Sequence, residues 1–132
     1  DLAKEKGAKR ALPLTVAGAY HSRLMESASP KLEAVLREVP LNLPNVPVVS
    51  NVTATPHATA GEILQRLVEQ VTSSVLWEAS IRHLLDEGFT RFIELGPGNA
   101  LTGFMRRIDR ELEVYNISDC ESLKKTVNAL KS

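Results

Sequence analysis

The sequence lacks the features that mark several large classes of protein. Its 132 residues contain one cysteine, Cys120, which excludes an internal disulfide framework, and they contain no C-x-x-C pair. No apolar run approaches the roughly 20 residues that cross a bilayer, and the polar amino end does not resemble a signal peptide. We therefore expect a soluble chain without a membrane partner, in a reducing compartment, the cytoplasm.

Neither sign of charge is in excess. Sixteen Lys plus Arg residues balance sixteen Asp plus Glu residues, so the molecule as a whole has no broad attraction for nucleic acid, and we expect no nucleic-acid partner. The three histidines and the cysteine are scattered without ligand spacing, and we expect no bound metal. Any charged partner must be met by a local patch.

The one cluster of glycines does not match a phosphate-binding loop. Gly96, Pro97 and Gly98 precede an expected helix, but the next glycine is Gly103, a spacing that fits neither the dinucleotide fingerprint nor the P-loop. Pro97 also lacks the amide hydrogen that such a loop uses. We interpret the cluster as a tight turn from a strand into a helix, and we expect no cofactor.

What the sequence does contain is short strands alternating with amphipathic helices. With 43% apolar residues it fits one modest globular unit with a real core. Strands are expected over Ala11 to Val16, Val46 to Val49, Phe92 to Leu95 and Val114 to Ile117. A helix end is expected at Asp1 to Gly7, and a further helix is expected to begin at Ser22. Apolar residues at helical spacing predict helices around Ile63 to Val71, Trp77 to Leu85 and Leu101 to Ile108, and a last helix is expected to start at Ser118. This alternation predicts an α/β fold with a mainly parallel sheet.

Three local signals refine the expected elements. Pro13 cannot donate to a ladder, so the first strand is expected at an edge. Ser29 and Pro30 can restart a helix as its cap and first residue, and Ser118 with Glu121 forms a potential capping box.

Of the three histidines, His21 has the most suggestive position. It lies in a loop of small residues between an expected strand and an expected helix, from which a side chain can project into a cleft. The same position also suits a structural histidine at a helix start. His57, in a polar loop, and His83, on an expected helix, have ordinary surroundings.

No serine stands in the G-x-S-x-G turn that carries the nucleophile of many acyl-transfer enzymes. Ser22 follows His21 directly, and we interpret it as a helix cap, since neighbouring side chains at a helix start usually diverge. Acyl transfer or hydrolysis by Ser22 with His21 stays open as an alternative. A histidine without a nucleophile cannot perform covalent acyl transfer alone.

Five segments, in order along the whole chain, are similar to the malonyl-CoA:acyl carrier protein transacylases, members of the acyltransferase family of fatty acid and polyketide synthesis. These segments are GAKRALPL, GAYHSRLM, VPVVSNV, LVEQVTSSVLW and FIELGPGNALTGFMRRI. The resemblance implies the carboxyl-terminal part of a larger α/β-hydrolase-like subdomain with a short, mainly parallel sheet. Residues 1 to 16 would then end a ferredoxin-like small subdomain, and residues 17 to 132 would belong to the large one.

In this family a serine attacks malonyl-CoA, releases coenzyme A and passes the malonyl group to the phosphopantetheine thiol of acyl carrier protein. The resemblance implies that the catalytic positions here are His21, as general base, and Gln70, whose main-chain carbonyl orients the imidazole. Since that contact uses the main chain, we expect a mild effect from changing the Gln70 side chain. Malonyl-CoA and coenzyme A serve as substrate and product, with no further cofactor.

The resemblance also implies two binding roles. Tyr20 matches a bulky aromatic residue that favours malonyl over methylmalonyl units in related domains. Lys9 and Arg10 match a basic cleft rim that suits an acidic carrier protein, although two solvated side chains explain them equally well.

The chain departs from the family in what it does not contain. The serine turn, the arginine that grips the malonyl carboxylate and the oxyanion-hole loop would all precede Asp1. We therefore expect the chain alone to be inactive, to need the missing amino-terminal portion of the enzyme as a partner, and to expose apolar faces. The alternative is a noncatalytic domain of the same fold that binds acyl carrier protein.

Overall fold

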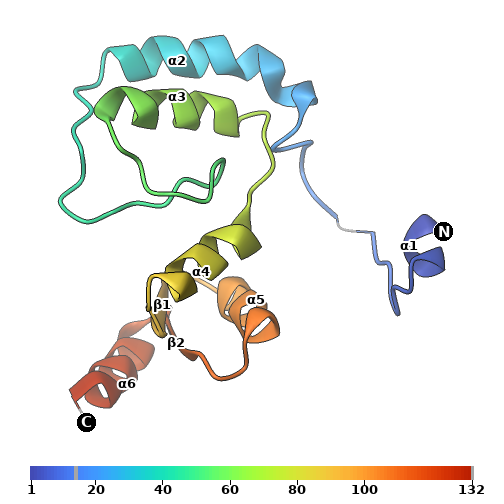
Figure 1. The fold of residues 1–132 in the computed structure, drawn as a ribbon, viewed down its shortest axis with the longest axis vertical. Helices are drawn as coiled ribbons and strands as arrows, with labels where there is room; N and C mark the ends of the chain where they lie inside the picture. The colour runs from blue at the N-terminus through green and yellow to red at the C-terminus, as the bar shows by residue number, and fades with distance from the viewer. Residues whose placement is uncertain (14, 132) are drawn as a thin grey trace.

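The computed structural model describes residues 1–13 and 15–131 (Figure 1). The elements in chain order are α1 (Leu2–Glu5), the 3-10 helix η1 (Arg23–Ala28), α2 (Ser29–Arg37), α3 (Ala60–Gln70), α4 (Trp77–Asp86), β1 (Arg91–Leu95), α5 (Ala100–Ile108), β2 (Glu113–Ile117) and α6 (Cys120–Lys131). No helix within these residues is long and apolar enough to cross a membrane.

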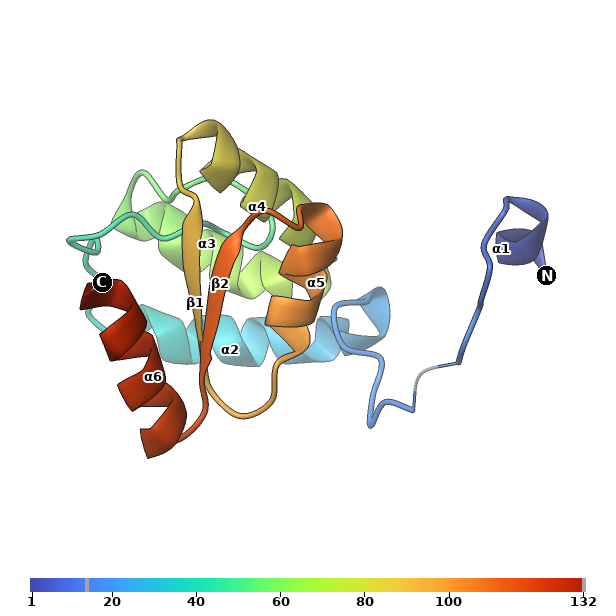
Figure 2. The ribbon, with the colours of Figure 1, turned by 90° about the horizontal axis from the view of Figure 1, so that it is seen from below.

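The carboxyl-terminal half contains a parallel strand pair with helices around it. β1 and β2 pair in register from Arg91 opposite Glu113 to Leu95 opposite Ile117, and α5 makes the crossover between them. Figure 2 shows α6 on one side of the pair and α4 and α5 on the other. The expected α/β class with a short parallel sheet is confirmed.

The amino-terminal half contains the two helices that position the candidate site. α2 and α3 lie side by side and contact each other (Figure 1). η1 leads directly into α2, with Pro30 in the first turn of α2. The expected cap is wrong by one residue, because Ala28 precedes the helix and Ser29 is its first residue. The chain therefore reaches α2 through η1, which begins directly after Ser22, and it leaves α3 at Gln70.

Two expected strands are wrong. The described residues between 11 and 16 form no strand, and Leu14 lies outside the described residues. The run from Val46 to Val49 contributes only an isolated antiparallel bridge between Val49 and Pro56. A strand needs a neighbour that bonds to it along its length. The second run has only a short antiparallel contact, in which His57 N also donates to Val48 O. Pro47 removes one donor as well.

The expected capping box of α6 is also displaced by one residue. Asp119 Oδ1 accepts from Ser122 N at 2.8 Å, and Ser122 Oγ accepts from Asp119 N at 3.0 Å. The reciprocal pair is thus Asp119 with Ser122, in place of Ser118 with Glu121. An ionised carboxylate is the stronger acceptor at a helix amino terminus, where peptide dipoles leave positive charge.

The core is much thinner than the composition predicts. Among the described residues the buried apolar side chains are Ala54, Ile81 and Met105. Large apolar residues stay exposed on several elements, including Val35 on α2 at 60% and Leu95 on β1 at 76%. The expected exposed apolar faces are therefore present, because two strands cannot cover the apolar faces of all the helices.

The amino terminus of α5 is held by a carboxylate from β1. Asn99 precedes the helix without a side-chain cap. Glu94 instead accepts from Leu101 N at 3.1 Å, Thr102 N at 2.9 Å and Thr102 Oγ1 at 2.6 Å. The hydrogen bonds from Thr102, its hydroxyl first, lower the pKa of Glu94. The strand and its crossover helix are thereby joined at the turn between them.

We expect Glu94→Gln to destabilise the fold at neutral pH and to remove part of its acid sensitivity. Because the folded pKa is lowered, the stabilisation by Glu94 is complete above the ordinary glutamate pKa of about 4.3 and is lost as pH falls through the folded pKa. Urea unfolding should show a lower midpoint for the variant at about pH 7 and a narrower difference at about pH 3. Glu111→Gln, in the exposed turn before β2, is the control. The same difference in urea midpoint between wild type and Glu94→Gln at both pH values would contradict the stabilising role of the Glu94 carboxylate.

Candidate active site

His21 occupies a constrained loop immediately before η1. Its φ is +58°, a left-handed conformation that residues other than glycine seldom adopt. Ser22 closes the loop, because its Oγ donates to Ala19 O at 2.7 Å and accepts from Leu24 N at 3.3 Å. The expected role of Ser22 as a cap is confirmed. The same hydroxyl also fixes the turn that holds His21.

The imidazole of His21 meets the carboxyl end of α3. His21 Nδ1 lies 3.0 Å from the main-chain oxygen of Gln70, 49 residues further along the chain. The helix ends at Gln70, and the amides of Val71, Thr72 and Ser73 bond to earlier carbonyls. The Gln70 carbonyl is thus one of the acceptors that a helix end leaves without an intrahelical donor.

This geometry favours one tautomer of the ring. A carbonyl oxygen only accepts, so a hydrogen bond to it requires the proton of the neutral ring on Nδ1. The Gln70 amide nitrogen, a donor 3.1 Å from the same atom, then makes no hydrogen bond to it. Nε2 then carries the lone pair and can accept a proton. His21 is exposed, which leaves the ring accessible from solvent.

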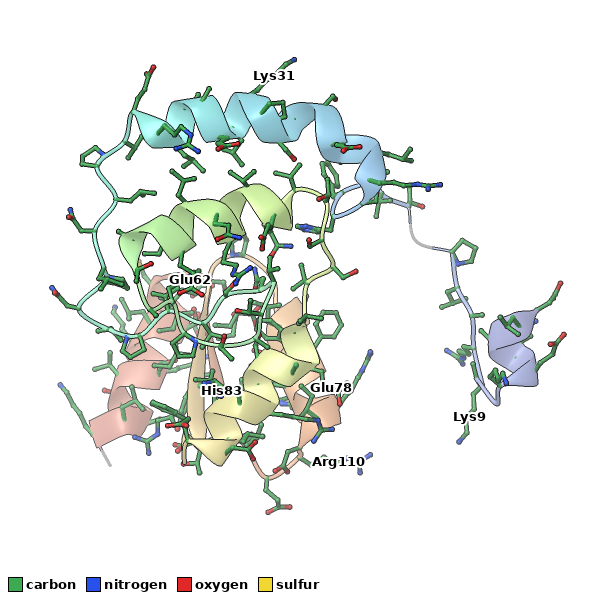
Figure 3. The ribbon with its side chains drawn as sticks, turned by 45° about the horizontal axis from the view of Figure 1, so that its top comes forward. Lys9, Lys31, Glu62, Glu78, His83 and Arg110 are labelled. Atoms are coloured by element: carbon green, nitrogen blue, oxygen red, sulfur yellow. The ribbon has the colours of Figure 1, made fainter. Side chains whose placement is uncertain are left out.

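The other residues implied by the resemblance are placed differently. Tyr20 is adjacent to His21, is 61% exposed, and lies so close to Gly18 that a Cβ there would meet Tyr20 Cζ at 3.3 Å. Lys9 and Arg10 are exposed on the segment after α1, which extends away from the rest of the chain in Figures 1 and 3. Tyr20 thus neighbours His21 along the chain with its ring against Gly18, and the structure does not bring the two basic residues to His21.

Neither of the other histidines shares this arrangement. His83 lies on α4, in the layer below α2 and α3 (Figure 3). His57 has a buried Nδ1 without a hydrogen-bond partner among the described atoms. Within residues 1–13 and 15–131, no three His, Cys, Asp or Glu side chains gather as metal ligands would.

Sequence reasoning missed one contributor to this site, the side chain of Gln70. Its Nε2 donates to Ser73 O at 2.9 Å and lies 3.1 Å from His21 Nδ1. Gln70 lies at the edge of the apolar stripe of its helix and near the helix end, which could have indicated a role for its side chain there. Nothing in the sequence indicated that this side chain bonds to Ser73 O.

Comparison with known proteins gives a consistent result. No family model matches the chain. Malonyl CoA-acyl carrier protein transacylase of Bacillus subtilis is 44% identical over 131 residues, which are 99% of this chain and 41% of the relative. The crystal structure of MCAT from Streptococcus pneumoniae superposes with a TM-score of 0.90 at 36% identity, covering 97% of this chain and 42% of that chain.

A further solved structure includes a partner. It is a complex of PlMCAT, a malonyl-transacylase, with AntF, a type II PKS acyl-carrier protein, and PlMCAT matches with a TM-score of 0.88 at 36% identity. The match covers 96% of this chain and 41% of that one. The chain therefore spans about two fifths of the length of the proteins that it resembles, at their carboxyl-terminal portion.

Proposed function

Because the chain matches the carboxyl-terminal portion of the malonyl CoA-acyl carrier protein transacylase family, we propose that it supplies the general base of a malonyl transfer reaction. The base is His21, and the serine that carries the malonyl group comes from the amino-terminal portion of the enzyme. The observation that carries this proposal is the contact between His21 Nδ1 and the Gln70 carbonyl.

The proposed reaction assigns each ring nitrogen of His21 one task. Nε2 takes the proton of the serine hydroxyl while the serine oxygen forms its bond to the malonyl carbonyl carbon. The carbon–sulfur bond then breaks, and the coenzyme A sulfur leaves with the proton from Nε2. The same steps with the thiol of acyl carrier protein, in reverse order, release the malonyl group from the serine.

Nδ1 keeps its proton throughout. The Gln70 carbonyl accepts from it and stabilises the imidazolium that forms when Nε2 is protonated. A carbonyl does this with a partial charge where other acyl-transfer enzymes use a carboxylate. The chemistry needs no group beyond malonyl-CoA, the carrier thiol and the protein.

We further propose acyl carrier protein as the partner of the complete enzyme, in the cytoplasm, where type II fatty acid synthesis supplies it. The complex of PlMCAT with AntF supports the partner. Tyr20, beside His21, remains the candidate for malonyl selectivity. Lys9 and Arg10, exposed on the segment after α1, remain candidates for contact with the acidic surface of the carrier protein.

The experiment that tests the proposal is a transfer assay from malonyl-CoA to the carrier protein. Protein that includes the amino-terminal portion of the family should transfer, and the chain of residues 1 to 132 should not. A noncatalytic carrier-binding domain is the second candidate, and the exposed apolar surface is what favours it. That candidate predicts saturable carrier binding by the isolated chain, with no transfer in either protein.

A further inference from the structure

The side-chain amide of Gln70 makes contacts that the main-chain role does not require. Its Nε2 donates to Ser73 O at 2.9 Å, which connects the last residue of α3 to the turn that follows. The same nitrogen lies 3.1 Å from His21 Nδ1. Gln70 therefore borders the imidazole with its main chain and its side chain together.

The hydrogen bond from Gln70 Nε2 to Ser73 O lies at the carboxyl end of α3, where the backbone is least constrained. Beyond Gln70 the chain tightens, with Val71 N bonding to Val68 O and Ser73 N bonding to Glu69 O. The Gln70 carbonyl receives no amide of this turn, so its direction is set by the peptide geometry of residues 70 to 73. Helix ends fray readily, and a carbonyl in a frayed turn does not keep a fixed direction.

The orientation of His21 depends on that direction. The ring is exposed, and the Gln70 carbonyl is the acceptor for the Nδ1 proton. The Gln70 amide nitrogen lies 3.1 Å from the same atom, but as a donor it makes no hydrogen bond to a protonated Nδ1. If the carbonyl swings away, the proton can move from Nδ1 to Nε2, and the nitrogen that should act as base then carries a hydrogen. Holding the carbonyl in place thus selects the productive tautomer.

We propose that the Gln70 side chain is a positioning residue: by donating to Ser73 O it holds the carboxyl end of α3 so that the Gln70 carbonyl stays on His21 Nδ1. This inference rests on the proposed general-base role of His21. It replaces the expectation that changing the Gln70 side chain is mild. The amide acts through its own main chain and touches no reacting atom.

The test is Gln70→Met, which keeps the length and helix propensity of the side chain and removes the donor. In protein that includes the amino-terminal portion, kcat for malonyl transfer should fall about tenfold with KM for malonyl-CoA unchanged, since misplacement of a catalytic group affects the chemical step. The matched control is Gln65→Met on the same helix, whose amide donates to Glu69 Oε1 at 2.9 Å. It should leave kcat unchanged.

A second readout separates positioning from general stability. Ring ¹⁵N NMR of His21 should show the proton on Nδ1 in the wild type, and Gln70→Met should shift part of the population to the other tautomer. A variant that melts earlier while keeping the wild-type ring signals and kcat would overturn the proposal.

Failure of the proposed general-base role of His21 gives a different set of results from failure of the Gln70 positioning role. If His21 is not the base, wild type and His21→Ala transfer malonyl equally well, whatever Gln70→Met does to the ring signals. If only the positioning role of the Gln70 side chain is wrong, His21→Ala abolishes transfer while Gln70→Met changes neither the ring signals nor kcat.

Discussion

His21→Ala should reduce the rate of malonyl loading by between about 10²- and 10⁴-fold, the range that a positioned general base contributes. The substitution removes the proposed acceptor of the serine proton at the site bordered by Gln70. The loss should fall on kcat, because the proposed role of His21 concerns the chemical step and not substrate binding. Single-turnover loading of protein that includes the amino-terminal portion measures it.

His83→Ala is the matched control for this experiment. His83 lies on α4, away from the helix end that His21 meets, and it is only partly exposed. The control should load at the wild-type rate. Equal losses in the two variants would indicate a general effect on folding and would remove the assignment of His21 as base.

Met105→Ala should cost about 2 to 5 kcal/mol of unfolding free energy, as removal of a buried large side chain does. Met105 is 3% exposed and lies with Ile81 in the small core between α4, α5 and the strands. Since domains are stable by only about 5 to 15 kcal/mol, this one change removes a large share of the total. Urea unfolding of the 132-residue chain measures it.

Met25→Ala is the control of the same residue type. Met25 lies on η1 and is only partly buried, so its replacement should cost clearly less than that of Met105. Equal losses of unfolding free energy in Met105→Ala and Met25→Ala would contradict a core centred on Met105 between α4, α5 and the two strands.

Elements that depend on local pattern were predictable from the sequence. Helical spacing of apolar residues predicted α3 and α5, and the short run from Val114 to Ile117 predicted β2. A helix follows from its own side chains, because its backbone bonds lie within the segment. Val46 to Val49 is short, apolar and β-branched like a strand, but the described chain pairs it only through an isolated bridge between Val49 and Pro56. Pairing is a property of two segments, and one segment does not reveal it.

The site shows the same division. Ser22 as a cap follows from residue type and position, since a serine before a helix has its partner two residues away. The contact of His21 with Gln70 spans 49 residues, and only the resemblance to the transacylase family implied it. Two further bonds had no sequence signal, because each joins the end of one element to residues outside it. Glu94 joins β1 to the first turn of α5, and Gln70 joins the end of α3 to the turn at Ser73.

The most direct test of the account is to locate the malonyl group on the protein. Protein that includes the amino-terminal portion is incubated with malonyl-CoA, quenched in acid, digested and mapped by mass spectrometry. The account predicts one malonyl ester, on a serine outside residues 1 to 132, that His21→Ala greatly diminishes. A malonyl ester on Ser22, or an ester whose amount is unchanged in His21→Ala, would contradict it.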